Sequence, residues 1–517
     1  MTGVQTCALP ICWDYETPKY ERYNRMMRGL DFNAPSPIAP QVQGLNLKGA
    51  VLFAGVGGQS KYSFEPDRNN FQPRLGVSYR ITDDWVVRAG YGLYYAGESE
   101  MGAPQGFSRR TTAVVSLDGG LTPAVRTANP FVNLPAGRLL EPIGASLGAA
   151  SFLGEGLTVN FLNRPLPQSH QYSVDIQRSL PGNLLVEVGY TANQLRKLPI
   201  SVALNVIPAA ELGRRLPTGA IDTAYYTTRI PNPMAGLIPA NAALNGATIP
   251  RQNLLVPFPQ FSSLTLANVP IGRQRYDALH VKATKRMSHG LTFLASYTLG
   301  KTLEEVNLLN TQDFVFNDPK QTPLAKLHAN ELDTPHKIAV TGVFDLPFGR
   351  NKPWGSAWGG PLNALLGGWQ LNWHFHYMVG WVIDYPNAKQ VRPGSAELPK
   401  SERTMARWFN TSLWDDPATG RRVPVQEAYT LRDFPLRFGD VRVPNYHNWD
   451  ASMSKYFYLH EELRLQFRFE MVNAMNHPWF RSMAGGFNNV ASAAFGQLSP
   501  VQSNLPRFIK LALHLMW

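Results

Sequence analysis

The segment 505–517 constrains the fold of this chain more than any other stretch of its sequence. Side chains of a β-strand point alternately to two faces, whereas a helix would spread the same residues around its circumference. As a strand, the segment would carry on one face Ile509, Leu511, Leu513, Leu515 and Trp517. Its other face would carry Lys510, Ala512, His514 and Met516. A large apolar face and a terminal aromatic residue are typical of the last strand of an outer-membrane β-barrel, whose apolar face meets lipid. We therefore interpret the five apolar residues as a barrel-assembly signal. A soluble sandwich strand with one buried face is the alternative.

Further segments alternate in the same way between turn residues, which is the pattern of antiparallel hairpins. The expected strands, about twelve in all, cover 45–53, 75–80, 87–95, 172–176, 184–190, 279–284, 293–299, 338–344, 369–381, 450–457, 463–470 and 505–517. No run approaches the roughly 20 consecutive apolar residues of a membrane-spanning helix. The predicted fold class is all-β: an antiparallel transmembrane outer-membrane β-barrel.

The connections between these strands are of two kinds. Tight turns at 82–84, 181–183 and 288–290 alternate with long excursions at 97–165, 200–270, 303–333, 385–440 and 477–504. Loops beyond about 15 residues are uncommon in compact soluble domains. Outer-membrane barrels combine short periplasmic turns with long extracellular loops. The pattern therefore favours a barrel, although the long connection at 347–367 must also lie on the turn side.

The charge of the chain excludes one class of partner. Lys and Arg number 49 against 37 Asp and Glu, a formal charge of +12, and these residues are scattered along the chain. Nucleic-acid binding is therefore not expected, because it requires a clustered basic surface. Basic residues that face a lumen or anionic lipid headgroups account for the same excess.

The first residues differ from the rest of the chain. Both cysteines, Cys7 and Cys12, lie there, and Pro10 interrupts a short apolar run that has no basic residues before it. These features do not match a secretory signal. The segment resembles a translated sequencing-adapter artefact, so we exclude residues 1–12 from the fold and expect a truncated start. Residues 13–517 are taken as one cysteine-free domain, which suits an oxidising compartment.

The expected strand 369–381 carries aromatic residues on one face, namely Trp369, Trp373, Tyr377 and Trp381. Aromatic residues form girdles at the two membrane interfaces of a barrel, so we expect these four to face lipid. The opposite face carries His374 and His376. Two imidazoles without a nearby cysteine or carboxylate are a weak metal signal. We expect the two histidines to be polar residues that face the lumen, and we predict no metal site.

No enzyme motif occurs in the chain: there is neither a Gly-x-Ser-x-Gly elbow nor a His-Glu-x-x-His pair. We therefore expect no catalytic residue, no cofactor and no enzymatic activity. Trp408, Phe409 and Trp414 in the excursion 385–440 are weak candidates for stacking on sugars or peptides. Packing within the loop is their alternative role.

An ordered set of short segments resembles the Oar-like TonB-dependent receptors. The segments are 69–76 (NNFQPRLG), 276–279 (YDAL), 295–298 (ASYT), 333–336 (DTPH), 366–370 (LGGWQ) and 473–478 (NAMNHP). The resemblance covers 13–517 and implies an outer-membrane transporter whose barrel of about 22 strands is closed by a plug and energised through TonB. It also implies an N-terminal regulatory domain. The chain would then be the C-terminal portion of that barrel, incomplete, without the plug, the TonB box and the regulatory domain.

These patterns and the resemblance lead to one main hypothesis. We expect an integral protein of the cell outer membrane that forms part of a TonB-dependent transporter or receptor for a bulky nutrient, of the carbohydrate or peptide class. The expected partners are outer-membrane lipid and lipopolysaccharide, the barrel-assembly machinery, and TonB through the missing N-terminal part. A secreted soluble β-rich carbohydrate-binding or hydrolase domain and a passive porin are the alternatives. Burial of Leu511, Phe375 and Val186 between two stacked layers would favour the soluble domain.

Overall fold

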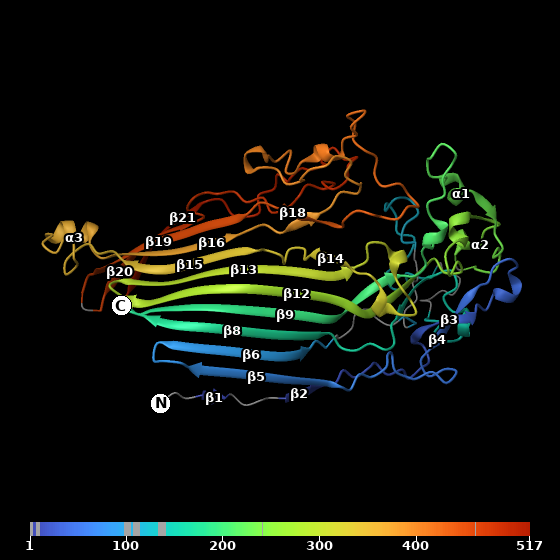
Figure 1. The fold of residues 1–517 in the computed structure, drawn as a ribbon, viewed down its shortest axis with the longest axis horizontal. Coiled ribbons are helices and arrows are strands. Elements are labelled where there is room, and N and C mark those ends of the chain that lie inside the picture. Colours follow the sequence, from blue (N-terminus) through green and yellow to red (C-terminus); the bar gives the residue numbers. More distant parts are fainter. Residues whose placement is uncertain are drawn as a thin grey trace.

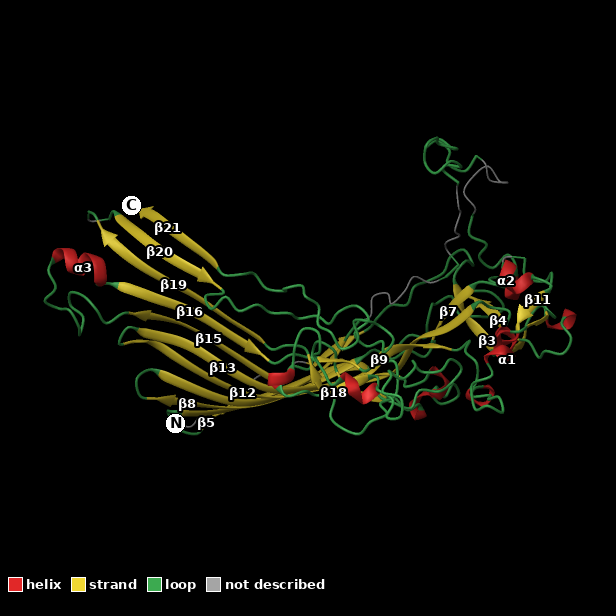
Figure 2. Cartoon of the chain, turned by 90° about the horizontal axis from the view of Figure 1, so that it is seen from above, coloured by secondary structure: helices red, strands yellow, loops and turns green. Residues whose placement is uncertain are grey.

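A computed structural model of the chain shows one large, curved β-sheet with packed loop regions beyond one of its ends (Figures 1 and 2). The structure describes residues 4–6, 11–97, 105–106, 114–132, 141–239, 241–460 and 462–517. Three parts of the excursion expected at 97–165, namely 98–104, 107–113 and 133–140, therefore lie outside the described residues. Among the described helices, none is both long and apolar enough to cross a membrane.

Among the described residues, fifteen strands make up the large sheet, and twelve of them form its main path. In order these are β1 (Val4–Thr6), β5 (Asn70–Arg80), β6 (Trp85–Tyr95), β8 (Gln168–Leu180), β9 (Leu184–Ala203), β12 (Ser263–Ser288), β13 (Leu291–Asn307), β15 (His336–Asp345), β16 (Trp369–Met378), β19 (Tyr446–Tyr458), β20 (Arg464–Val472) and β21 (Phe508–Met516). All neighbours on this path are antiparallel. Beside the path, β2 (Ile11–Asp14) pairs with β5, β14 (Ala325–His328) pairs with β13, and β7 (Gly156–Asn160) runs parallel to β12. The predicted all-β, antiparallel fold class is confirmed.

Tight turns join the strands where the sequence predicts them. His289 and Gly290 connect β12 to β13 with φ angles of 51° and 76°, and Gly182 and Asn183 between β8 and β9 have φ angles of 79° and 61°. Two successive positive φ angles twist the chain in the sense that the flanking strands require, and Gly and Asn adopt them at low cost. These turns therefore fix the register of the central hairpins.

The two ends of the sheet differ as the turn–loop pattern predicts. The tight turns and the last strand, β21, end on one side of the molecule, and the long excursions gather on the other (Figure 1). The long connection 347–367 also lies on the turn side, where it forms the short helix α3 (Gly360–Leu366). We call these the turn end and the loop end of the sheet.

The expected first strand, 45–53, is a strand but not part of the large sheet. Residues Lys48–Phe53 form β4, which pairs only with β3 (Met27–Pro35) in a separate two-stranded sheet. Both strands lie at the loop end (Figure 1). Val51 and Phe53 are buried there against Leu157 and Val159 of β7, so burial within a loop region produces the apolar alternation of this segment.

Several strand limits also differ from the prediction. The excursion expected at 200–270 is shorter, because β9 continues to Ala203 and β12 already begins at Ser263. Similarly, β13 continues to Asn307. In contrast, the strand expected at 369–381 ends at Met378, so its continuation through Trp381 is wrong. Beyond the apolar band both faces of a strand contact polar groups or loops, so the two-residue hydropathy period no longer marks the strand.

The described residues at the loop end form three buried apolar clusters. The first combines β3, β4 and β7 with the extensions of β9 and β12. The second surrounds Met234 and Ile238 between residues 38–47, α2 (Ala242–Asn245) and the hairpin β10 (Arg229–Pro231)–β11 (Thr248–Pro250). The short helix α1 (Thr223–Thr227) lies at the same end of the molecule (Figure 1). The third joins the excursions 385–440 and 477–504 around the pair β17 (Val382–Asp384) and β18 (Arg437–Arg442). We call this third cluster the loop core.

The large sheet is a single layer, which bears on the soluble alternative. Leu511 is 64% exposed, and Phe375 and Val186 are half-buried. No second sheet stacks on the large one within the described part of the chain, as can be followed in the view from above (Figure 2). The two stacked layers that a soluble sandwich requires are therefore not found.

Both lateral edges of the large sheet are open in the described residues. In the part of the chain that the structure describes, β21 pairs with β20 alone, and at the opposite edge β5 carries only the short strands β1 and β2. Part of the segment 1–12 is thus paired with β5. An exposed strand edge accepts extended segments through main-chain groups alone, so the assignment of residues 1–12 to an artefact stays a prediction.

Candidate functional site

The strand register brings the apolar residues of neighbouring strands onto one face of the sheet. Leu511 and Leu513 of β21 lie opposite Phe469 and Phe467 of β20. The predicted signal residues are all at least half exposed, with exposed fractions of 52% for Ile509, 64% for Leu511, 66% for Leu513, 51% for Leu515 and 89% for Trp517. We call this side of the sheet the apolar face. A row of large apolar side chains this exposed is stable against lipid and unfavourable in water.

The other side of the sheet, the polar face, carries paired charges. Arg468 Nη2 lies 2.5 Å from Glu470 Oε1, and Lys510 Nζ lies 3.9 Å from the second oxygen of Glu470. His374 and His376 also lie on this face, beside Thr341 and Ala339 of β15. Within the described residues no group of three or more His, Cys, Asp or Glu side chains could hold a metal ion. The two faces therefore differ in the way that lipid on one side and a watery lumen on the other would require.

The four predicted girdle residues separate into two groups. Trp369, Trp373 and Tyr377 follow one another on the apolar face of β16, all half-buried. Trp381 lies beyond the strand at the loop end. Its ring packs edge-to-face on Trp479 at 6.2 Å and belongs to the border of the loop core. Trp381 is thus separated from the other three because β16 stops before it.

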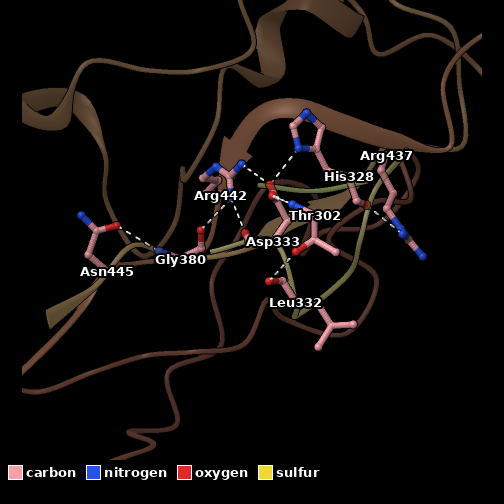
Figure 3. A network of polar contacts seen from close by, with 8 residues as sticks. All are labelled: Thr302, His328, Leu332, Asp333, Gly380, Arg437, Arg442 and Asn445. Atoms are coloured by element: carbon pink, nitrogen blue, oxygen red, sulfur yellow. Dashed lines mark hydrogen bonds and ion pairs between the residues drawn. The ribbon is translucent and has the colours of Figure 1, made fainter. Parts of the chain in front are cut away.

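A network of polar contacts around Asp333 joins the strands to the loop core at the loop end (Figure 3). One Asp333 carboxylate oxygen accepts the Thr302 N–H at 2.8 Å, and the other lies 2.7 Å from His328 Nδ1 and 2.6 Å from Arg442 Nη2. Arg442 also donates to the Asp333 carbonyl at 2.6 Å and to the Gly380 carbonyl at 3.1 Å. We call this network the Asp333 hub. It ties β13, β14 and β18 to the segment that directly follows β16.

The Asp333 carboxylate is ionised in this environment. Its side chain is only 1% exposed, and this burial alone would raise its pKa. The Thr302 N–H and the Arg442 guanidinium outweigh that effect and hold the pKa of Asp333 below its ordinary value. The neighbouring Arg437 extends the hub, since it pairs with Glu304 of β13 and donates to the His328 carbonyl at 3.0 Å. The hub therefore holds the loop core at a fixed place above the strands.

The three aromatic candidates of the excursion 385–440 lie in or beside the loop core. Phe409 and Trp414 are fully buried, and Trp414 Nε1 donates to the Ala388 carbonyl at 2.9 Å. Trp408 is half-buried at the edge, where its Nε1 donates to the Arg442 carbonyl at 2.6 Å. The rings of Phe409 and Trp414 leave no surface for a ligand in this arrangement. Both rings pack within the loop, which is the alternative that the sequence left open.

A cleft of about 980 Å³ lies where β8, β9, β12 and β13 extend toward the loop end, beside residues 319–326. Its cations are Arg196, Lys197, Arg273, Arg275, Lys320 and Lys326, and its carboxylates are Asp277 and Glu305. We call it the basic cleft. The sequence prediction missed this site because its cations come from three separate segments. One feature of the sequence could have indicated the cleft. Arg273 and Arg275 are separated from Leu279 by even numbers of residues, so they lie on the same face of the strand as this apolar residue.

This combination of faces, turns and loops defines the class of the protein. A single antiparallel sheet with an exposed apolar face, a polar opposite face, tight turns at one end and long structured loops at the other has the architecture of an outer-membrane β-barrel. The family comparison agrees with the architecture. Residues 6–510 match the outer membrane beta barrel domain, so the chain belongs to that family and is located in the outer membrane.

Solved structures add similarities over part of their own length. The outer membrane transporter YddB from Escherichia coli shares 9% identity over 86% of this chain and 40% of its own, with a TM-score of 0.40. The FrpB iron transporter from Neisseria meningitidis shares 8% identity over 87% of this chain and 40% of its own, with a TM-score of 0.36. The ferripyoverdine receptor of the outer membrane of Pseudomonas aeruginosa shares 10% identity over 91% of this chain and 35% of its own, with a TM-score of 0.35. The chain thus spans two fifths or less of the length of these structures. No curated protein sequence matches it.

Proposed function

We propose that the chain forms the barrel wall and outer loops of a TonB-dependent transporter of the Oar-like type, which takes up a bulky nutrient of the carbohydrate or peptide class. The observation that carries this proposal is the Asp333 hub. It anchors a packed loop region to the strand ends, whereas loops without such anchors would move freely over the opening. Anchored extracellular loops can present a preformed surface to a large ligand. The polar face below them then supplies a hydrated path.

The open edges of the large sheet support a larger assembly. Unpaired strand edges in a bilayer leave main-chain N–H and C=O groups without partners, at a cost of several kcal/mol each. In this proposal further strands complete a barrel of about 22 strands, and this chain, from residue 13 onward, supplies its C-terminal portion. The remainder would provide the plug, the regulatory domain and the segment that contacts TonB.

The same proposal assigns roles to the apolar residues of β21 and to the aromatic residues of β16. Ile509, Leu511, Leu513, Leu515 and Trp517 would be read by the barrel-assembly machinery, because they form an exposed apolar row on an open edge strand. Trp369, Trp373 and Tyr377 would contact outer-membrane lipid from the apolar face of β16. Lipopolysaccharide would border the same face at the loop end. No residue is assigned a catalytic role.

The alternatives now stand differently. A secreted soluble domain is wrong, since the chain belongs to an outer-membrane family and its sheet is a single layer with an exposed apolar face. A passive porin shares the barrel wall and differs by the absence of a plug. The two remaining functions therefore differ in whether the pore is closed at rest.

Expression of Trp13–Trp517 behind a signal peptide tests the membrane role directly. The expected product is found in the outer membrane and shifts its electrophoretic mobility on heating. Binding of a maltodextrin ladder and of a casein digest to the purified product then tests the nutrient class, with the Asp333→Asn variant as comparison. A soluble periplasmic product, or binding of neither mixture, would contradict the proposal. In planar bilayers, steady conductance by the gene product that includes its upstream region would favour the porin instead.

A further inference from the structure

We propose that the basic cleft binds the phosphate groups of a phosphorylated glycolipid in the outer leaflet of the membrane. This inference rests on the proposed assignment of the apolar face to lipid. It concerns a different ligand and a different surface from the nutrient site, because the cleft lies outside the barrel wall. The argument follows from the strand register, the local backbone geometry and the charges that line the cleft.

The register places the cleft on the apolar face. Leu279 of β12 lies opposite Tyr190 of β9 and Leu299 of β13, all three exposed on that face. Side chains two residues apart share a face, so Asp277, Arg275 and Arg273 continue the same row toward the loop end. The apolar band and the basic cleft are therefore consecutive parts of one surface. A lipid whose acyl chains contact the band has its headgroup at the level of the cleft.

A row of tyrosines marks the border between the band and the cleft. Tyr91 of β6 lies opposite Tyr172 of β8, and their rings stack at 5.9 Å. Tyr190 of β9 follows, and its hydroxyl donates to Asp277 Oδ1 at 2.5 Å. Tyrosine is enriched where acyl chains give way to headgroups, since its ring is apolar and its hydroxyl polar. The row thus places the cations just beyond it in the headgroup layer.

A bulge in β9 directs two of the cations into the cleft. The pairing of β9 with β12 shifts between Gly272 and Gln274, where Arg196 and Lys197 stand opposite the single residue Arg273. Lys197 has a φ of +57°, a left-handed conformation that is costly for lysine. Bulges re-aim side chains in this way and are common beside binding sites. Arg196 and Lys197 consequently both line the cleft, although they are adjacent in sequence.

Most of the positive charge in the cleft is not neutralised by the protein. Arg275 is engaged, because Nε and Nη2 donate to the two oxygens of Asp277 at 2.6 and 2.9 Å. Among the described residues, none of the other five cations forms an ion pair with a carboxylate. Glu305 offsets one of these five charges, which leaves a net charge of +4 in the cleft. The converging cations repel each other unless an anion binds between them. Phosphate groups suit such a cleft, since guanidinium and ammonium groups both donate to phosphate oxygens.

The test measures glycolipid binding by the 517-residue chain purified in detergent. Three probes are compared: phosphorylated lipid A, the same lipid with its phosphates removed, and inositol hexakisphosphate. Loss of Arg196, Lys197 and Arg273 in a triple glutamine variant should weaken lipid A binding by about a hundredfold, since each cation near a membrane surface contributes about 1 kcal/mol. The matched control replaces Arg88, Lys282 and Lys337 of the polar face with glutamine and should retain binding.

A single substitution separates the binding role from folding. Lys197→Gly removes one cation and relieves the positive φ, because glycine adopts that conformation without strain. It should fold at least as well as the original chain and bind lipid A several-fold more weakly. Equal losses in the triple variant and its control, or unchanged binding by Lys197→Gly, would overturn the proposal. Equally tight binding of inositol hexakisphosphate would show that the site takes a soluble phosphate compound and not a lipid. Heat-modifiability of each variant reports membrane assembly separately from lipid binding.

Discussion

Arg442 binds Asp333 through both of its terminal nitrogens, across 109 residues of sequence (Figure 3). Nη2 donates to the carboxylate at 2.6 Å and Nη1 to the main-chain carbonyl at the same distance. Asp333 precedes β15 and Arg442 ends β18, so this contact joins the strand ends to the loop core. This charged pair is therefore one of the contacts that hold the loop core above the strands.

We predict that Asp333→Asn loosens the loop core. Asparagine keeps an oxygen for the Thr302 N–H but removes the negative charge that faces Arg442, at a cost of about 3 kcal/mol for breaking a buried pair. Limited proteolysis should cleave residues 385–440 faster in the variant. Asp433→Asn is the control, because Asp433 and Lys389 form a pair in which each side chain is 63% exposed. Equal cleavage of the two variants would contradict a special role for Asp333.

We predict two separate responses of the loop end to acid. Burial and the neighbouring His447 lower the pKa of His477 from its ordinary 6.5, so the folded state disfavours its protonation. The rings of His447 and His477 stack with their centroids 3.5 Å apart. Because the folded state disfavours protonation of His477, this stacking is intact above pH 6.5 and weakens as the pH falls below that value. Trp479, two residues further on, should report this change by fluorescence. His477→Gln should abolish this response.

The second acid response belongs to Asp333. Its pKa lies below the ordinary 3.8, so the stabilisation from its ionised form is complete above pH 3.8 and is lost as the pH falls further. Tryptophan fluorescence of the loop core should then change in a separate step that is absent from Asp333→Asn. If His477→Gln and Asp333→Asn both showed the same single transition, His477 and Asp333 would not act independently.

We predict that aspartate on the apolar face of the last strand prevents assembly. Leu515→Asp together with Trp517→Asp places charge in or beside hydrocarbon, at a cost of up to a few kcal/mol per residue that depends on depth. The yield of heat-modifiable protein in the outer membrane should fall to background. His514→Asp on the polar face introduces the same group and should assemble normally. Undiminished yield of the double variant would refute the assembly role of this strand.

We predict that Trp414→Ala destabilises the loop core, because the ring is fully buried. Loss of a buried tryptophan costs about 3–5 kcal/mol, and hydrogen exchange across 385–440 should increase accordingly. Trp354→Ala at the turn end is the control, since Trp354 is 60% exposed. If Trp414→Ala left exchange unchanged and abolished nutrient binding, the ring would act as a ligand platform and not as core.

The alternation of side chains along the chain was sufficient to predict the all-β class, the apolar face of β21 and the separation of tight turns from long loops. These features depend on the spacing of residues two apart and on local turn preferences. Both can be recognised from the amino-acid sequence alone. The same reasoning predicted the strand within 45–53 but not the separate sheet that it joins, and it extended the strand at 369–378 too far, to Trp381. In both cases apolar residues are buried by loop regions, and an apolar pattern does not specify which surface will cover it.

Only the tertiary structure decided where the excursions fold and which residues meet there. Asp333 and Arg442, or Arg196 and Arg273, become neighbours because strand register brings distant segments to one level of the sheet. The bulge at Lys197 further depends on pairing with β12 and leaves no mark in hydropathy. Local sequence thus determined the strands and their two faces, since a strand's period is a property of its own backbone. The hub and the basic cleft required the register, because contacts between strands are set by how the whole sheet pairs.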